Sequence, residues 1–180
     1  MNIKCIVVSD THGSDFLLRK AIRLHRDAQV LFFLGDGLSD LAELMTELQE
    51  RGIAVIAVKG NCDFRSAVLG NNIKKTEIIE LLGKTILVTH GDLCEVKYGT
   101  AQIEKLAEDI GADVVLFGHT HEKLERYVDV TEKYKDIEGY HEKLCQMKNY
   151  YLFNPGSASQ YGSYGVLTLG EDYCLFSHGD

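Results

Sequence analysis

Short apolar runs rich in valine and isoleucine recur along the chain, and amphipathic stretches separate them. The densest runs are Ile3–Val8, Val30–Leu34, Ile53–Val58 and Val114–Phe117. Their length and their lack of polar alternation are typical of strands that are buried on both faces. Because strands alternate with helical patterns and later give way to strands alone, we expect an α/β layered fold.

The remaining elements follow from periodicity and from turn residues. Apolar side chains at helical spacing predict two helices in the first third of the chain and a third helix before Gly111. A hairpin is expected around Gly83-Lys84, and strand-like pieces fill the tail. The expected helices are Asp15–Arg26, Leu38–Glu50 and Gly99–Ile110, and the expected strands are Lys74–Leu82, Thr85–Thr89, Tyr150–Phe153, Gly165–Leu169 and Tyr173–Phe176.

The length of 180 residues fits one ordinary domain, so we expect a single domain over residues 1–180. Residues 122–149 fit this scheme poorly. About half of Glu122–Lys148 is charged, yet apolar side chains are interspersed, and the stretch is long for a loop. We predict an insertion here, and two interpretations stay open: a lid or contact between subunits, or a solvated excursion.

The charge balance bears on partners and location. Lys+Arg 19 against Asp+Glu 27 gives a formal net charge of −8, which disfavours long duplex nucleic acid and anionic membrane surfaces. The apolar runs are too short to span a bilayer, and no basic segment precedes a long apolar one at the start. The five cysteines include no Cys-x-x-Cys pair and indicate free thiols. We expect a cytoplasmic protein.

Side chains that bind metals follow each buried strand at the point where it ends. Ligands of open α/β sheets bind in the crevice beyond the carboxyl ends of the strands, so these side chains are expected to converge. Carboxylate, amide and imidazole donors suit manganese, iron, nickel, cobalt or zinc. The candidates are Asp10, His12, Asp36, Asn61, His90, His119 and His121.

Each motif has an ordinary structural explanation when it stands alone. Asp10-Thr11-His12 could cap a helix, and Gly35-Asp36 and Gly60-Asn61 could be turns. Together, however, the seven side chains suffice for two cations if one carboxylate is shared. Two cations about 4 Å apart would acidify a water molecule and hold a phosphoryl group for in-line attack. The set therefore predicts a dinuclear metal site, and no cysteine has the spacing of a structural zinc site.

In this order, Asp-x-His, Gly-Asp, Gly-Asn-x-Asp, His-Gly and Gly-His-x-His resemble the motifs of the calcineurin-like metallophosphoesterases. Cys62 within Gly-Asn-Cys-Asp, together with the late Asn154-Pro155-Gly156-Ser157, is similar to the small prokaryotic YfcE-type phosphodiesterase branch. The resemblance implies a four-layer αββα sandwich of two mixed β-sheets flanked by helices. It also implies a phosphodiesterase in which a metal-bridging hydroxide attacks a small phosphodiester.

The same resemblance implies the roles of the residues. Manganese is the favoured metal, with nickel, cobalt, iron or zinc as alternatives. One cation would take Asp10, His12, Asp36 and His121, and the other would take Asp36, Asn61, His90 and His119. The residues expected to take part in catalysis are Asp36, Asn61, His90 and Cys62.

Cys62 stands where many members of the family carry histidine. A thiol with an ordinary pKa near about 8.5 is a weaker proton donor than imidazolium, so we expect a preference for good leaving groups or a proton from metal-bound water. A nucleophilic Cys62 is the less favoured interpretation, because the metals supply a nucleophile. Asp63 would lack its usual histidine partner and is expected to orient a neighbouring loop.

Other functions share this set of motifs. A phosphomonoesterase or a nucleotide pyrophosphatase could use the same metals, since specificity lies in the surrounding loops. A non-catalytic protein-binding scaffold of the same fold is a further alternative, although every ligand position is filled here. A homo-oligomer formed through the insertion also stays open.

Overall fold

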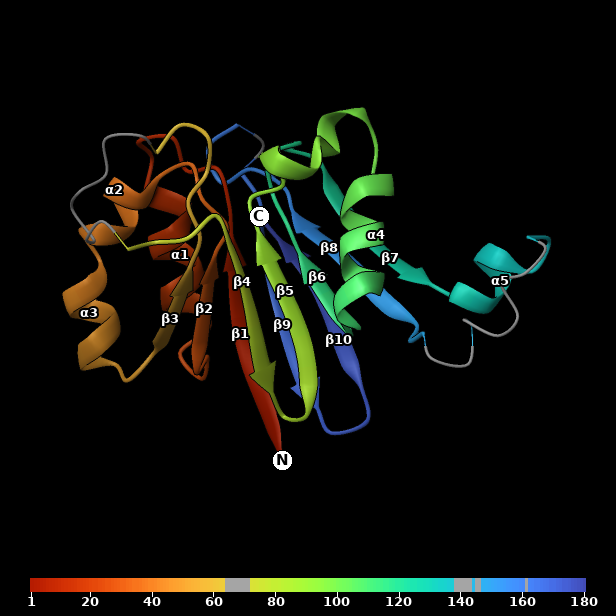
Figure 1. Cartoon of the computed structure of the whole chain (residues 1–180). Helices are drawn as coiled ribbons and strands as arrows, with labels where there is room; N and C mark the ends of the chain where they lie inside the picture. The colour runs from red at the N-terminus through yellow and green to blue at the C-terminus, as the bar shows by residue number, and fades with distance from the viewer. Residues whose placement is uncertain (64–71, 138–143, 145–146, 161) are drawn as a thin grey trace.

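The structure is a computed structural model that describes residues 1–63, 72–137, 144, 147–160 and 162–180. Two five-stranded sheets stack on each other, and helices cover their outer faces (Figure 1). The first sheet has the order β10-β9-β1-β2-β3, with β1 (Asn2–Val8), β2 (Val30–Phe33), β3 (Ala54–Ala57), β9 (Tyr164–Gly170) and β10 (Cys174–Gly179). The second has the order β4-β5-β6-β8-β7, with β4 (Thr76–Leu81), β5 (Lys84–Thr89), β6 (Val114–Leu116), β7 (Lys123–Val128) and β8 (Tyr150–Pro155).

Both sheets are mixed. β1 pairs parallel with β2 and antiparallel with β9, whereas β6 pairs parallel with both β5 and β8. The helices are α1 (Phe16–Leu24), α2 (Leu38–Ala42), α3 (Met45–Glu50), α4 (Ala101–Ile110) and α5 (Val130–Tyr134), with two 3-10 turns, η2 (Asp92–Cys94) and η3 (Val96–Tyr98), before α4.

Three apolar clusters separate the four layers. One lies between the first sheet and α1–α3, one between the two sheets, and one between the second sheet and α4. The side chains of β1 alternate between the first two clusters, with Ile6 on the helix side and Val7 between the sheets. This alternation explains why β1 carries no polar face in the sequence. The predicted αββα sandwich is confirmed.

One expectation about this architecture needs correction. The helix expected over Leu38–Glu50 is two helices, because the N–H of Leu44 bonds to the carbonyl of Leu41, three residues back, at 2.9 Å. A bond of this 3-10 type tightens the chain between α2 and α3. The strands that precede the candidate ligands are divided between the two sheets, since β1–β3 belong to the first sheet and β5 and β6 to the second.

The predicted insertion, residues 122–149, begins as part of the second sheet. β7 is the edge strand of that sheet, and Lys123 pairs with Pro155 at one end while Val128 pairs with Tyr150 at the other. β7 therefore runs away from the carboxyl ends of the parallel strands, and α5 follows it beyond the sandwich (Figure 1). Within the described residues, this segment does not lie over the edge that carries the candidate ligands. The limits of the insertion stay a prediction.

The described part of the insertion is tied to α4. Lys133 Nζ lies 2.6 Å from a Glu104 carboxylate oxygen and 2.7 Å from one of Glu108, and Tyr134 donates to Glu108 at 2.7 Å. Val130 is buried in the cluster beneath α4. These contacts disfavour a solvated excursion for this part of the chain. Among the described residues, no helix combines the length and the hydropathy needed to cross a membrane.

Candidate metal centre

The loops after β1, β2, β3, β5 and β6 meet at one end of the sandwich. The two sheets touch there: a Cβ on Gly118 would lie 1.9 Å from Ser9 Oγ, so only glycine allows this approach. A backbone bond from Asp10 to Gly35, 3.0 Å long, joins the first two loops. The stacking of the sheets therefore brings together all seven predicted ligands (Asp10, His12, Asp36, Asn61, His90, His119 and His121).

Three donors form the first cluster. Asp10 Oδ1 lies 3.1 Å from His121 Nε2 and 3.6 Å from His12 Nε2. The Nε2 atoms of His12 and His121 are 3.4 Å apart. Two donors on one tetrahedral cation, each about 2.1 Å from it, are separated by about 3.4 Å. The spacing of this trio is therefore that of ligands to a single ion.

The second cluster surrounds His90. Its Nε2 atom lies 3.1 Å from Asn61 Oδ1, 3.1 Å from His119 Nδ1 and 3.4 Å from Asp36 Oδ2. The same Asp36 oxygen is 4.0 Å from His12 Nε2 in the first cluster. One oxygen of Asp36 thus faces both groups of donors, as a bridging ligand would.

Each aspartate uses its other oxygen to fix its own position. Asp10 Oδ2 accepts hydrogen bonds from the Ser9 hydroxyl at 2.5 Å and from the backbone N–H of His119 at 3.1 Å. Asp36 Oδ1 accepts from the backbone N–H of Cys62 at 2.7 Å. The carboxylates are therefore oriented by protein groups, and one oxygen of each stays directed at the site.

The histidine rings are oriented in the same way. Nδ1 of the fully buried His90 lies 2.8 Å from the carbonyl oxygen of Leu34. A neutral His90 donates there and leaves the Nε2 lone pair for a cation. Nδ1 of His121 lies 2.5 Å from Gln160 Oε1, which serves the same purpose for that ring.

The backbone at the site is in an uncommon conformation. Seven non-glycine residues of the described chain have positive φ, namely Asp10, His12, Asp36, Leu82, Glu95, His119 and His121, and five of them are predicted ligands. Side chains with a Cβ disfavour this left-handed region. Such residues cluster where the surrounding structure forces a functional geometry, and here they mark the predicted site.

Asp63 holds the loops that carry Asp36 and Asn61. Its buried carboxylate accepts four backbone hydrogen bonds of 2.8–3.0 Å, two from Gly37 and Leu38 and two from Asp36 and Gly60. The expectation that Asp63 orients a neighbouring loop is confirmed.

Two further positioning residues escaped the sequence analysis. Asp40, buried in α2, accepts hydrogen bonds from the Thr11 hydroxyl and from the N–H of Gly13, the latter at 2.9 Å. Asn154, at the end of β8, donates to the carbonyl of Gly118 at 3.0 Å. Asp40 gave no distinct signal, because an acidic residue in the first turn of a helix is common. Asn154 lies at the carboxyl end of a buried strand, the position at which the candidate ligands were sought.

The charges of the site shift its pKa values. Burial alone raises the pKa of Asp36, but hydrogen bonding with His90 and its positive charge outweigh this effect and hold the pKa well below its usual range. For His90, burial lowers the pKa, but the hydrogen bond with Asp36 and the negative charges of Asp10 and Asp36 outweigh this effect, so the pKa of His90 is raised. Burial and the neighbouring His90 and Lys97 lower the pKa of His119.

Cys62 lies at the exposed mouth of the site. Its sulfur is close to His12 and Asp36, within a group whose ligand atoms all lie within 4.8 Å of one another. Burial, a hydrogen bond with Asp36 and the nearby carboxylates raise the pKa of Cys62 to about 11. An uncharged thiol is a poor nucleophile. Cys94, in contrast, is buried in the cluster beneath α4 and does not face the site.

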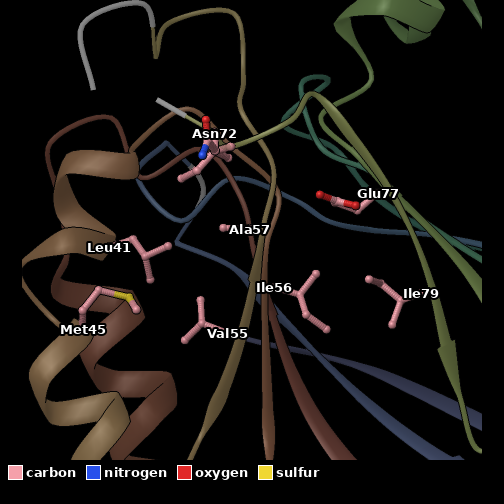
Figure 2. A pocket seen from close by; sticks show the side chains of 9 residues that line it. Leu41, Met45, Val55, Ile56, Ala57, Asn72, Glu77 and Ile79 are labelled. Atoms are coloured by element: carbon pink, nitrogen blue, oxygen red, sulfur yellow. The ribbon is translucent and has the colours of Figure 1, made fainter. Parts of the chain in front are cut away.

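A cavity of about 420 Å³ lies elsewhere, between α2, α3 and the edge strands β3 and β4. Figure 2 shows that apolar side chains such as Leu41, Met45, Val55 and Ile79 line it. It contains none of the predicted ligands. The cavity and the metal chemistry are therefore separate features of the molecule.

Known proteins share this sequence and fold. Residues 3–172 match the model of the calcineurin-like phosphoesterase superfamily domain. The probable metallophosphoesterase YsnB of Bacillus subtilis is 33% identical over 121 residues, which cover 67% of this chain and 64% of that protein, less than two thirds of its length. Phosphodiesterase YfcE of Escherichia coli strain K12 is 28% identical over 186 residues, covering 92% of this chain and 87% of that protein.

A solved structure described as a novel archaeal phosphodiesterase superposes with a TM-score of 0.68 at 24% identity, covering 98% of this chain and 99% of the other. It supports the fold. The family match extends over nearly the whole sequence and includes every loop that carries a predicted ligand. The chain belongs to the calcineurin-like phosphoesterase superfamily, with YfcE and YsnB among its relatives.

Proposed function

We propose that the protein is a phosphodiesterase that uses two divalent cations to hydrolyse a small phosphodiester. The observation that carries this proposal is the pair of donor clusters that share Asp36 Oδ2, which lies 4.0 Å from His12 Nε2 and 3.4 Å from His90 Nε2. Relatives named metallophosphoesterase and phosphodiesterase support it.

The donors present fit two cations. The first would be held by Asp10, His12, Asp36 and His121, and the second by Asp36, Asn61, His90 and His119. Mixed oxygen and imidazole donors without a thiolate suit manganese, with nickel, cobalt, iron or zinc as alternatives. When bound, such cations acidify water and neutralise charge on a phosphoryl group.

The protein's own groups position these ligands and the substrate. Asp36 sets the separation of the two clusters, and the bond between His90 and the Leu34 carbonyl fixes which nitrogen faces the site. Asn61 directs its amide oxygen to His90, and its Nδ2 donates to Cys62 Sγ at 3.2 Å. The thiol of Cys62, whose pKa is raised to about 11 in the metal-free site, is a weak hydrogen-bond donor to a leaving oxygen. Substrates with good leaving groups are therefore favoured.

The alternatives differ in what they require of the site. A phosphomonoesterase or nucleotide pyrophosphatase would use the same donors. A protein-binding scaffold would need neither the full donor set nor the positive φ values at five of its members, so catalysis is favoured. Self-association through residues 122–149 is compatible with either function. The unpaired state of all four described cysteines supports a cytoplasmic location.

The experiment that tests the proposal is hydrolysis of bis-p-nitrophenyl phosphate by chelator-stripped protein, with and without Mn²⁺, together with a count of bound metal. We expect turnover that depends on Mn²⁺ and two ions bound per chain. The Asp36→Asn variant should lose both the turnover and the binding of two ions. Asp109→Asn, at an exposed position of α4, is the matched control and should behave as the parent protein. If the protein binds two ions but hydrolyses the ester with none of manganese, nickel, cobalt, iron and zinc, the scaffold is favoured.

A further inference from the structure

The loop between β5 and α4, here called the rim loop (residues 91–99), folds back onto the segment that carries His90. The N–H of Cys94 bonds to the carbonyl of Gly91 at 3.1 Å. Val96 packs so closely on Gly91 that a Cβ there would lie 2.8 Å from Val96 Cγ2. Val96 is thus held against the residue that follows His90, and Figure 1 shows these turns at the same end of the sandwich as the loops after β1–β3.

The rim loop is fixed from several directions. Cys94 and Val96 are buried in the apolar cluster beneath α4. Glu95 has a φ of 50° between the two 3-10 turns, and Gln102 donates to its carboxylate at 2.7 Å. Lys75 Nζ lies 2.6 Å from Asp92 Oδ2. The exposed side chains of the loop are therefore presented on an ordered frame.

Those exposed side chains are of a kind that binds ligands. Tyr98 is 92% exposed and is the most exposed large apolar side chain of the described residues, and Leu93 is 60% exposed. Lys97 is also exposed and, within the part of the chain that the structure describes, forms no salt bridge.

We propose that Lys97 and Tyr98 form a subsite for the nucleoside part of a nucleoside phosphodiester whose phosphate lies at the metal centre. The Tyr98 ring would stack on the base, and the Lys97 ammonium would attract the phosphate charge. The chain as a whole carries a net charge of −8. Lys97, which pairs with no carboxylate of the described residues, would give an anionic substrate a local attraction at this edge. The inference rests on the proposed function and names its substrate class.

A comparison of two esters with the same leaving group tests the subsite. Thymidine 5′-p-nitrophenyl phosphate carries a base, and methyl p-nitrophenyl phosphate does not. We expect Tyr98→Ala to raise KM for the thymidine ester by about five-fold relative to the methyl ester, which is the low end of what base stacking contributes. Tyr98→Phe keeps an aromatic ring and should retain the KM ratio of the parent protein. Tyr173→Ala, at a 44% exposed tyrosine beside the start of β10, is the control and should leave the ratio of the two KM values as in the parent.

A binding measurement separates this inference from the proposed function. The sequence contains no tryptophan, so Tyr98→Trp introduces a single fluorophore. We expect thymidine 5′-monophosphate to quench it saturably in the Mn²⁺-loaded protein, and not to quench Tyr173→Trp. Saturable quenching without turnover of either ester would keep the subsite and overturn the phosphodiesterase. Turnover with an unchanged KM ratio in Tyr98→Ala, or quenching that is absent or equal in both tryptophan variants, would overturn the subsite.

Discussion

Asp63 is the side chain on which the geometry of the bridging aspartate depends most directly. Its carboxylate is 5% exposed and accepts hydrogen bonds from the N–H groups of Asp36, Gly37, Leu38 and Gly60 at 2.8, 2.9, 3.0 and 2.9 Å. Each oxygen serves two of these groups. In Asp63→Asn an NH₂ group replaces one oxygen, so two buried N–H groups lose their acceptor and face another donor.

The expected loss of stability follows from those two bonds. A hydrogen bond to a charged group contributes about 1.5–3 kcal/mol, so the free energy of unfolding should fall by about 3–6 kcal/mol. Groups that orient metal ligands also change metal affinity by about 10–100-fold when they are replaced. Asp63→Asn should therefore bind Mn²⁺ more weakly by a factor in that range, although Asp63 is not among the predicted ligands.

Urea unfolding of the metal-free protein, followed by circular dichroism, measures the first quantity, and isothermal titration with Mn²⁺ measures the second. Asp109→Asn removes a carboxylate from the exposed face of α4 and should change neither. A loss of less than about 1 kcal/mol in Asp63→Asn, where two such bonds predict about 3–6, together with unchanged Mn²⁺ affinity, would show that the loop does not depend on this carboxylate.

Three further predictions concern the thiol, the buried histidine and the insertion. The pKa of Cys62 is raised to about 11, so iodoacetamide should alkylate this thiol slowly at neutral pH in the metal-free protein and faster toward pH 11. Mass spectrometry measures the alkylation rate, and rapid alkylation at neutral pH would contradict the prediction. The pKa of His90 is raised on folding, so the stability that protonated His90 contributes is fully present below about pH 6.5 and is lost as the pH rises through the folded-state pKa. Urea unfolding at a series of pH values should show this loss of stability, and the His90→Gln variant should not show it. Lys133→Met removes the cation that Glu104 and Glu108 share, and Glu104 keeps its ion pair with Arg126. Since Lys133 is 29% exposed, the expected cost is about 1–2 kcal/mol, less than for a fully buried pair. Calorimetry should then show a Tm lower by roughly 2–8 °C, and an unchanged Tm would mean that this part of the chain is only loosely attached.

The convergence of the candidate ligands could be predicted because of where they stand in the sequence. A histidine at the end of an apolar strand, such as His90 directly after β5 or His119 shortly after β6, has no packing partner in a buried sheet. The carboxyl ends of parallel strands supply a position for it instead. The same reasoning applies to Asp10 and Asp36, which follow β1 and β2. Order and position relative to strands were therefore sufficient to predict which residues would converge.

The division of the strands between two sheets could not be predicted from periodicity. A strand buried on both faces has the same pattern whether helices or a second sheet cover it. β1 shows this, since Cys5 and Val7 face the other sheet and Ile6 and Val8 face the helices. Its partner β9 lies at the far end of the chain and pairs Val7 with Gly165. Only pairing over such distances assigns a strand to its sheet, and the resemblance to the family was needed to expect it.

The support that Asp40 and Asp63 give to the candidate ligands could be predicted only in part, because a loop-orienting role was expected for Asp63 without its partners and no role was expected for Asp40. Asp40 and Asp63 are ordinary residues for a helix start and a turn, so their composition does not distinguish a cap from a carboxylate that binds a distant loop. Asp40 contacts Gly13 across 27 positions, and Asp63 contacts Asp36 across 27 positions. Contacts of this kind depend on the close approach of loops that are far apart in the sequence.

The strained backbone bears on the choice between enzyme and scaffold. A left-handed conformation at a residue with a Cβ costs about 1–2 kcal/mol, and His12, Asp36 and His121 all adopt it. The buried acceptors at Asp63 and Asp40 offset this cost, yet a protein that used only its outer surfaces would gain stability by relaxing these loops or by placing glycine there. Cations that bind only the folded chain reverse the balance, since their binding free energy adds to the stability of this geometry. Retention of the strain together with the complete donor set is therefore expected of a chain whose function needs the metals.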